Sequence, residues 1–387
     1  MKTNTKRGIA VLLSLIMCVA LGTVSFAVDS TEVFNANAYS FIDTVEMGIA
    51  DVLGAVEISK SEYGLGDVDF ASLTLGKEIP SYELTENGLI RINDIHYFPI
   101  LFNNEWVATA VISYSVYGDM NIELSAKYTG DYSMLKNSIV SNKSRASTGV
   151  ALVFDSTNAY LYLDDESIVV ESFQEFKDRA SMNTYPESVC PATVQVIAQR
   201  DIETSHLELT RGSDEMVSLN ITAIQQTTQY TCWAASVAMI LNYRGTSATE
   251  SSVVSASGVG WSSYQDAIQC SDLISHNASY GYPCGIGGSI SYYGYYYRSN
   301  IYIENLKTEL YYLSSPLFAG FSSGTVGHAV TVKGYVNLAS LSTPTMTIID
   351  PADKAIKALS VPTSGAVTMV YGGSTRAFQA AFAVYAK

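Results

Sequence analysis

The sequence predicts an α+β protein built from two units, and three observations support this. The chain has 387 residues, more than one domain of ordinary size holds. Hydrophobic residues make up 48% of it and charged residues 15%, which leaves ample apolar material for packed cores. Charge then divides the chain, because residues 28–215 hold 30 acidic and 11 basic side chains whereas residues 216–387 hold 7 and 8.

An export signal precedes these units at residues 1–27. Lys2, Lys6 and Arg7 supply a positive start, an uncharged and mostly apolar run follows, and Ala27 completes a small-residue cleavage site. A membrane anchor is the alternative, but the run is short and lacks a positive flank on its far side. We expect cleavage after Ala27, export from the cell, and no membrane attachment of the secreted product.

The first unit, residues 28–198, is acidic and is expected to combine one helix with hairpin strands. Apolar residues recur at helical spacing over residues 40–58. Runs rich in Ile, Val, Tyr and Phe alternate with turn residues and predict strands at 89–102, 106–116, 150–154, 159–163 and 167–170. The formal net charge of the chain, −15, would repel phosphate backbones, so we expect no nucleic-acid partner.

A polar connector at residues 199–220 separates this unit from the second one at residues 221–387. Exposed polar stretches are the usual sites of proteolytic cutting, so the connector is predicted to be cleavable.

Cys232 lies in the most informative segment of the second unit, QTTQYTCWAASVAMILN at residues 226–242. Ala235, Met239 and Asn242 recur at helical intervals after it, which places Cys232 at the start of a helix. The helix dipole and the free N–H groups there favour an anion and lower the pKa of a thiol. A buried structural cysteine is the alternative that this segment alone leaves open.

A histidine and an aspartate follow at the ends of two expected strands. The run GHAVTVKGY places His328 at the start of a strand, and the run MTIIDP ends a strand at Asp350. An imidazole can accept a thiol proton while an acid fixes the imidazole tautomer, so the set predicts nucleophilic catalysis. Asn337 is the competing third member.

These motifs together resemble the papain-like cysteine peptidases. Glutamine stands six residues before the cysteine, tryptophan follows it directly, and the GHAV strand is similar to the family's histidine strand. Plant and lysosomal members usually carry asparagine at the third position, so the aspartate resembles instead the bacterial branch that includes the double-glycine-leader peptidases and the staphopain-like families. The resemblance covers residues 215–387. It implies a catalytic domain in which a helical half packs on an antiparallel β half, preceded by an acidic α+β prodomain.

The resemblance implies a role for each of four residues. Cys232 would be the nucleophile, His328 the general base and then the acid, and Asp350 the group that orients the histidine. Gln226 would donate its side-chain amide, together with the N–H of Cys232, to the developing oxyanion.

Three neighbouring side chains remain open in this interpretation. Gln225 and Gln229 are lesser candidates for the oxyanion site because they depart from the six-residue offset. Trp233 is either a core aromatic or a shield of the catalytic histidine.

The remaining cysteines fit an exported enzyme. Cys190 precedes the connector, and Cys270 and Cys284 are a candidate disulfide pair. A zinc site of Cys270, His276 and Cys284 is the alternative, but it lacks a fourth ligand and the close CxxC spacing. A tyrosine-rich loop at residues 280–297 either lines a cleft or packs on its own rings.

We therefore expect a secreted bacterial cysteine endopeptidase made as a zymogen. Its partners would be protein or peptide substrates and its own propeptide as an intramolecular inhibitor, and we expect a monomer without cofactor or metal. Two alternatives stay open: a cell-wall amidase or acyltransferase on the same fold, and a surface binding protein with a degenerate peptidase domain.

Overall fold

The structure is a computed structural model, and it describes residues 36–114, 119–140, 149–163, 166–172, 215–257, 296–298, 301–323, 326–362 and 366–383. The predictions for the export signal, for most of the connector and tyrosine-rich loop, and for Cys190, Cys270, His276 and Cys284 concern residues outside these ranges. They stay predictions. Within the described residues, no helix is both long enough and apolar enough to span a membrane.

The fold is mixed α+β, with mostly antiparallel sheets and few helices among the described residues. The helices are α2 (Ala36–Glu57), the 3₁₀ turn η1 (Phe70–Ser72), α3 (Thr129–Val140), α4 (Cys232–Tyr243), α5 (Glu250–Ser257), α7 (Ile303–Leu306) and the π-helical η2 (Lys307–Tyr312).

The strands before the connector are β1 (Thr74–Leu75), β2 (Ser81–Thr85), β3 (Gly88–Arg91), β4 (Ile95–Phe102), β5 (Glu105–Tyr114), β6 (Met120–Ser125), β7 (Val150–Phe154), β8 (Asn158–Leu163) and β9 (Glu166–Ser172). Those that follow are β10 (Glu215–Ser218), β11 (Tyr296–Arg298), β12 (Leu317–Ser323), β13 (Val326–Asn337), β14 (Thr345–Ile349), β15 (Ile356–Ser360), β16 (Thr368–Tyr371) and β17 (Ser374–Ala383).

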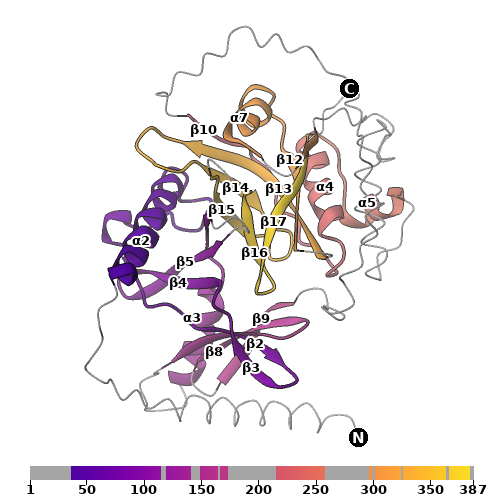
Figure 1. Cartoon of the computed structure of the whole chain (residues 1–387). Coiled ribbons are helices and arrows are strands. Elements are labelled where there is room, and N and C mark those ends of the chain that lie inside the picture. The colour runs from indigo at the N-terminus through magenta and orange to yellow at the C-terminus, as the bar shows by residue number, and fades with distance from the viewer. Residues whose placement is uncertain are drawn as a thin grey trace, which may run out of the picture.

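Twelve of the described strands form one sheet that crosses from the first half of the chain into the second (Figure 1). Its order is β1-β4-β5-β6-β15-β14-β13-β12-β17-β11, with β10 beside β13 and β16 beside β17. The crossing point is the antiparallel pair β6–β15, where Leu124 faces Ala358 and Glu123 faces Leu359. The division of the chain at residue 198 stays a prediction, but strands from both sides of it share this sheet.

Helix α2 covers the sheet at this crossing point. Val45, Ile49, Val52 and Val56 recur at helical spacing and are buried, because this apolar face packs against β6 and β15. Gly48 allows the close approach, since a Cβ there would collide with the side chain of Ile122.

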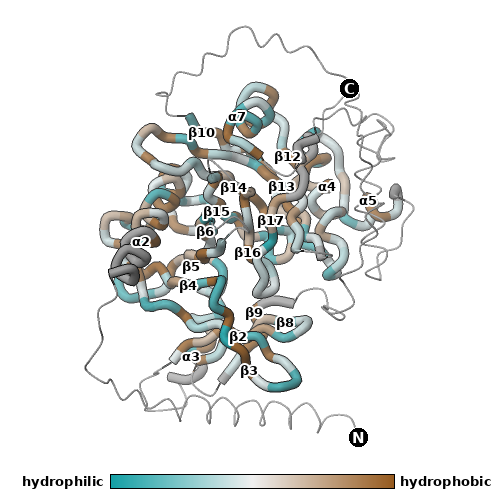
Figure 2. Tube along the Cα trace, viewed as in Figure 1, coloured by the Kyte–Doolittle hydropathy of each residue, from teal (hydrophilic) through white to brown (hydrophobic). Residues whose placement is uncertain are grey.

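The other five strands form a smaller sheet of order β3-β2-β7-β8-β9, in which β2 and β7 are parallel. In Figure 2 the turn of the β2–β3 hairpin is hydrophilic, as expected for an exposed loop. The β16–β17 turn touches this sheet. Gly373 has φ +67° there, and a Cβ on it would lie 2.6 Å from the ring of Phe154.

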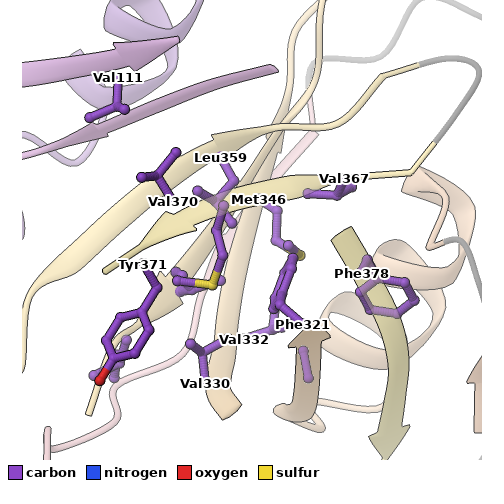
Figure 3. Packing of buried hydrophobic residues seen from close by; sticks show 14 of the residues in the cluster. Val111, Phe321, Val330, Val332, Met346, Leu359, Val367, Val370, Tyr371 and Phe378 are labelled. Atoms are coloured by element: carbon purple, nitrogen blue, oxygen red, sulfur yellow. The ribbon is translucent and has the colours of Figure 1, made fainter. Parts of the chain in front are cut away.

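One hydrophobic cluster joins the two halves of the chain. It contains Val111 of β5 together with Leu359, Val370 and Phe378 of the second half. Figure 3 shows Val111 across from Val370, with Leu359 and Met346 beyond them. Because the core is shared, the acidic first half and the neutral second half are packed as one body rather than joined only by the connector.

Most of the expected elements agree with the structure. The helix expected at 40–58 is α2, and the strand runs at 106–116, 150–154, 159–163 and 167–170 correspond to β5, β7, β8 and β9. The single run at 89–102 was a wrong prediction, because the polar pair Asn93-Asp94 separates β3 from β4 and the two strands join different sheets.

Candidate functional site

Cys232 is the first residue of α4, as the helical spacing predicts. The N–H groups in the first turn of a helix have no acceptor within the helix. In α4 this first turn begins at Cys232, so these N–H groups lie at the end of the helix that carries the thiol. The helix lies against β13 and β12, and the hydroxyl of Thr331 donates to the carbonyl of Ser236 at 3.2 Å. Cys232 as a residue is partly exposed.

His328 and Asp350 meet beside this thiol. His328 lies near the start of β13, and its Nε2 is 2.7 Å from Oδ1 of Asp350, which directly follows β14. Both side chains are buried. The same Oδ1 accepts from the N–H of Ala352 at 2.9 Å. The imidazole is also hydrogen-bonded to Cys232, and since Nε2 faces the carboxylate, Nδ1 is the nitrogen directed at the thiol.

The pKa values of the three groups are shifted toward a charged set. Burial opposes ionisation of Cys232, but the hydrogen bond and charge of His328 and the N–H of Ala329 outweigh it and lower the pKa of the thiol. Burial likewise opposes the imidazolium, yet Asp350 and Cys232 raise the pKa of His328 to about 9. Both shifts favour a thiolate beside an imidazolium over the uncharged pair.

Asp350 remains ionised although it is fully buried. Burial alone would raise the pKa of this carboxyl, but the charges of His328 and Lys357 hold it well below its usual range. Lys357 of β15 is also fully buried, and its Nζ lies 2.8 Å from Oδ2 of Asp350. It lies 3.2 Å from Oε1 of Glu123 on β6 as well, so a residue of the first half reaches the site.

An aromatic ring fixes the plane of the imidazole. Tyr371, at the end of β16, stacks on His328 with ring centroids 3.9 Å apart and an angle of 5° between the planes. The guanidinium of Arg376, on β17, lies over the Tyr371 ring with Cζ 4.7 Å from the centroid. Arg376 is fully buried. This stack restricts tilting of the imidazole ring.

The segment before α4 is tied to the same place. The N–H of Gln226 donates to the carbonyl of Pro351 at 2.8 Å, next to Asp350, and its Oε1 is buried without a hydrogen-bond partner among the described residues. The carboxylate of Glu250, at the start of α5, accepts from the N–H of Thr227 at 2.9 Å. Gln225 is exposed and donates instead to the carbonyl of Ala352, so Gln226 is the better placed of the two.

Two alternatives from the sequence lie elsewhere. Asn337 ends β13 beside Glu215, nine residues from His328, which corresponds to about 30 Å along a strand. Trp233 is buried in a cluster with residues of α4 and α5, such as Val237 and Val253. The ring that covers His328 is Tyr371, so Trp233 takes the place of a core aromatic.

Four residues at this site were missed in the sequence: Glu123, Lys357, Tyr371 and Arg376. Glu123 in the run MNIELS and Lys357 in the run IKALS are charged residues inside apolar strands, a pattern that indicates buried ion pairs. The pattern does not show which residue each one pairs with. Their pairing depends on which strands become neighbours. Among the residues that the structure describes, no group of three or more His, Cys, Asp or Glu side chains is placed to hold a metal ion.

Tyr371→Leu is expected to slow alkylation of Cys232 by iodoacetamide at pH 6. Without the flat ring the imidazole can rotate, so the hydrogen bond that lowers the thiol pKa weakens and less thiolate is present. Loss of an aromatic contact of about 1 kcal/mol corresponds to a rate about fivefold lower. Tyr371→Phe keeps the ring and is the matched control. Equal rates for the Leu and Phe variants would contradict this role of the stack.

In a comparison with protein families, residues 218–371 fit the model of the Peptidase C39 like family. The match covers less than half of the chain, and it contains Cys232, His328 and Asp350. No curated protein matches the chain. The family match supports a cysteine peptidase of the C39 or papain-like kind.

Proposed function

We propose that this protein is a secreted cysteine endopeptidase that cleaves peptide bonds through a covalent acyl-enzyme. The observation that carries the proposal is the contact of Cys232, His328 and Asp350, three residues far apart in the sequence, with pKa shifts that favour the thiolate–imidazolium pair. The family match supports the same chemistry.

In the proposed first step the Cys232 thiolate attacks the carbonyl carbon of the peptide bond. The negative charge moves to the carbonyl oxygen, where the N–H of Cys232 and the side-chain amide of Gln226 would stabilise it. The His328 imidazolium then gives its proton to the leaving amine, the C–N bond breaks, and a thioester remains on Cys232. Asp350 holds the ring in place while it loses its proton.

Water completes the cycle. His328, now neutral, takes a proton from water as the oxygen attacks the thioester carbon, and collapse of the intermediate releases the new carboxyl group and restores the thiolate. The ring thereby regains its charge. Because turnover needs the protonated ring, activity should be present below the His328 pKa of about 9 and be lost as pH rises through it.

We also propose that the protein is made as a precursor. The export signal would be removed after Ala27. A cut within residues 199–220 would then break the covalent link between the acidic first half and the catalytic unit. We propose that the precursor is inactive until it is cut, because an active peptidase would attack proteins of the cell that produces it.

The test of the proposed function is digestion of casein by the purified protein, compared with digestion of purified peptidoglycan. We expect casein to be cut, and an irreversible thiol-protease inhibitor to stop the reaction with one molecule bound per active site. Release of amino groups from peptidoglycan but not from casein would show the amidase alternative instead. A protein that neither cuts nor reacts with the inhibitor would be a binding protein with an inactive peptidase domain.

A further inference from the structure

The row of buried charges that begins at Cys232 does not end at Asp350. Oδ1 of Asp350 faces His328, whereas Oδ2 faces the Nζ of Lys357 at 2.8 Å. That Nζ faces Oε1 of Glu123 at 3.2 Å. Asp350 and Lys357 are fully buried and Glu123 is 3% exposed. Side chains of these types are rarely buried unless they are paired, so each charge in the row depends on its neighbours.

Glu123 supports the site by a second route as well. Its Oε2 accepts a hydrogen bond from the N–H of Val370 at 3.1 Å. The next residue is Tyr371, the ring that stacks on His328. One carboxylate therefore holds both the lysine that contacts Asp350 and the strand that carries the aromatic cover of the imidazole.

This carboxylate belongs to the first half of the chain. Glu123 lies on β6, which pairs with β15 next to Lys357, and the N–H of Ile122 donates to the hydroxyl of Ser360 at 2.8 Å. A cut in the connector would leave this strand pairing intact. Removal of the first half would take Glu123 away from Lys357 and expose the edge of β15.

We propose that Lys357 and Glu123 are positioning residues of the candidate active site, and that the first half of the chain stays bound to the catalytic unit in the working enzyme. Lys357 holds Oδ2 of Asp350 so that Oδ1 points at Nε2 of His328, and Glu123 holds Lys357. The inference rests on the proposed function for its kinetic consequence, but the geometry it uses is independent of the substrate.

The pH dependence of the site provides the test. Titratable and charged side chains reach His328 or its partners from α4, the turn after β14, and strands β15, β16, β17 and β6: Cys232, Asp350, Asp353, Lys357, Tyr371, Arg376 and Glu123. Lys357→Met removes a positive charge, so His328 should hold its proton to higher pH. Glu123→Gln removes a negative charge from the same row, so His328 should lose its proton at lower pH.

We expect the alkaline limit of kcat/KM on casein to move in opposite directions in the two variants, upward by about one pH unit for Lys357→Met and downward for Glu123→Gln. Both variants should lose kcat by about a hundredfold, the effect of misplacing a catalytic group by about 1 Å. The double variant, which loses both charges, should return the alkaline limit toward the wild-type value while kcat stays low. A merely structural role would change the yield of folded protein but not the pH limit.

Glu62→Gln is the matched control. Glu62 also belongs to the first half, and it pairs with a buried lysine of the second half, Lys333, at 2.6 Å. That pair has no contact with Asp350 in the described structure. The control also loses a Lys–Glu salt bridge between the two halves, although Glu62 is more exposed than Glu123, and its alkaline limit and kcat should equal those of the wild type.

Sites that react with an irreversible thiol inhibitor are counted first, so that kcat refers to folded enzyme. If Lys357→Met does not fold, Glu123→Gln, which keeps the shape of the side chain, decides alone: a lower alkaline limit supports the proposal and an unchanged limit overturns it. Wild-type enzyme from the medium that is active and free of the acidic fragment after gel filtration would overturn the retention of the first half.

Failure of the proposed function is distinguishable from failure of this inference. The rate at which iodoacetamide alkylates Cys232, followed by mass spectrometry across the pH range, reports the loss of the His328 proton without any substrate. A protein inactive on casein whose alkylation profile still shifts in opposite directions refutes the peptidase proposal and supports the positioning role. If the wild type cuts casein but the alkylation profiles of the variants do not shift, the peptidase proposal is supported and the positioning role is refuted.

Discussion

Replacing Cys232 by alanine is expected to abolish proteolysis while the protein stays folded. The variant keeps the start of α4 and the His328–Asp350 pair but has no atom that can form the thioester. In a serine protease, loss of the nucleophile lowers turnover about a million-fold, and we expect an effect of that order here. Casein digestion at matched concentrations of folded protein measures it.

Cys190→Ala is the control for this experiment, because it removes a cysteine that precedes the connector and is not among the candidate site residues. It should retain wild-type turnover. A Cys232→Ala protein that retains turnover within tenfold of the wild type would exclude Cys232 as the nucleophile.

The same alanine variant tests the precursor proposal. It should accumulate in the medium uncut, with Val28 at its N-terminus, and added active enzyme should cut it within residues 199–220. Mass spectrometry gives the mass of each product. A wild-type protein that is full-length from Val28 and already active on casein would show that cutting of the connector is not needed for activity.

Replacing Asp350 by alanine is expected to have the second largest effect, a loss of turnover of about a thousandfold or more. Without the carboxylate, His328 loses the partner that fixes its tautomer and stabilises its charge. Because Asp350 is a main cause of the raised pKa of His328, the alkaline limit of activity should also fall from about 9 toward the ordinary histidine value near 6.5. The pH profile of kcat/KM on casein measures both effects.

Asn337→Ala provides the comparison, since Asn337 was the competing third member in the sequence and lies at the far end of β13. It should change neither turnover nor the pH limit. A larger loss with Asn337→Ala than with Asp350→Ala would contradict the assignment of the third residue.

The candidate residues Cys232 and His328 could be proposed from local sequence. A cysteine at a helix start and a histidine at a strand start have short-range signatures, since helix spacing and apolar strand runs are visible within about ten residues. The sequence left Asp350 and Asn337 as alternatives for the third residue of the site. The order of the strands separates them, because β14 ends beside His328 whereas β13 carries Asn337 away from it.

The support around the site could not be predicted in this way. Glu123 and Lys357 become neighbours only because β6 of the first half pairs with β15, and such pairing between distant segments is set by the packing of whole strands rather than by local pattern. Tyr371 reaches His328 for the same reason, through the β16–β17 hairpin.

Helix formation and strand alternation are properties of short stretches of sequence. Cys232, His328 and Gln226 could be singled out from such stretches. The pairing of a buried lysine with two carboxylates is different, because it depends on which charges are removed from water together when the shared core forms. Local sequence thus pointed to the candidate reacting groups, whereas the contact of the two halves determines which side chains surround and hold them.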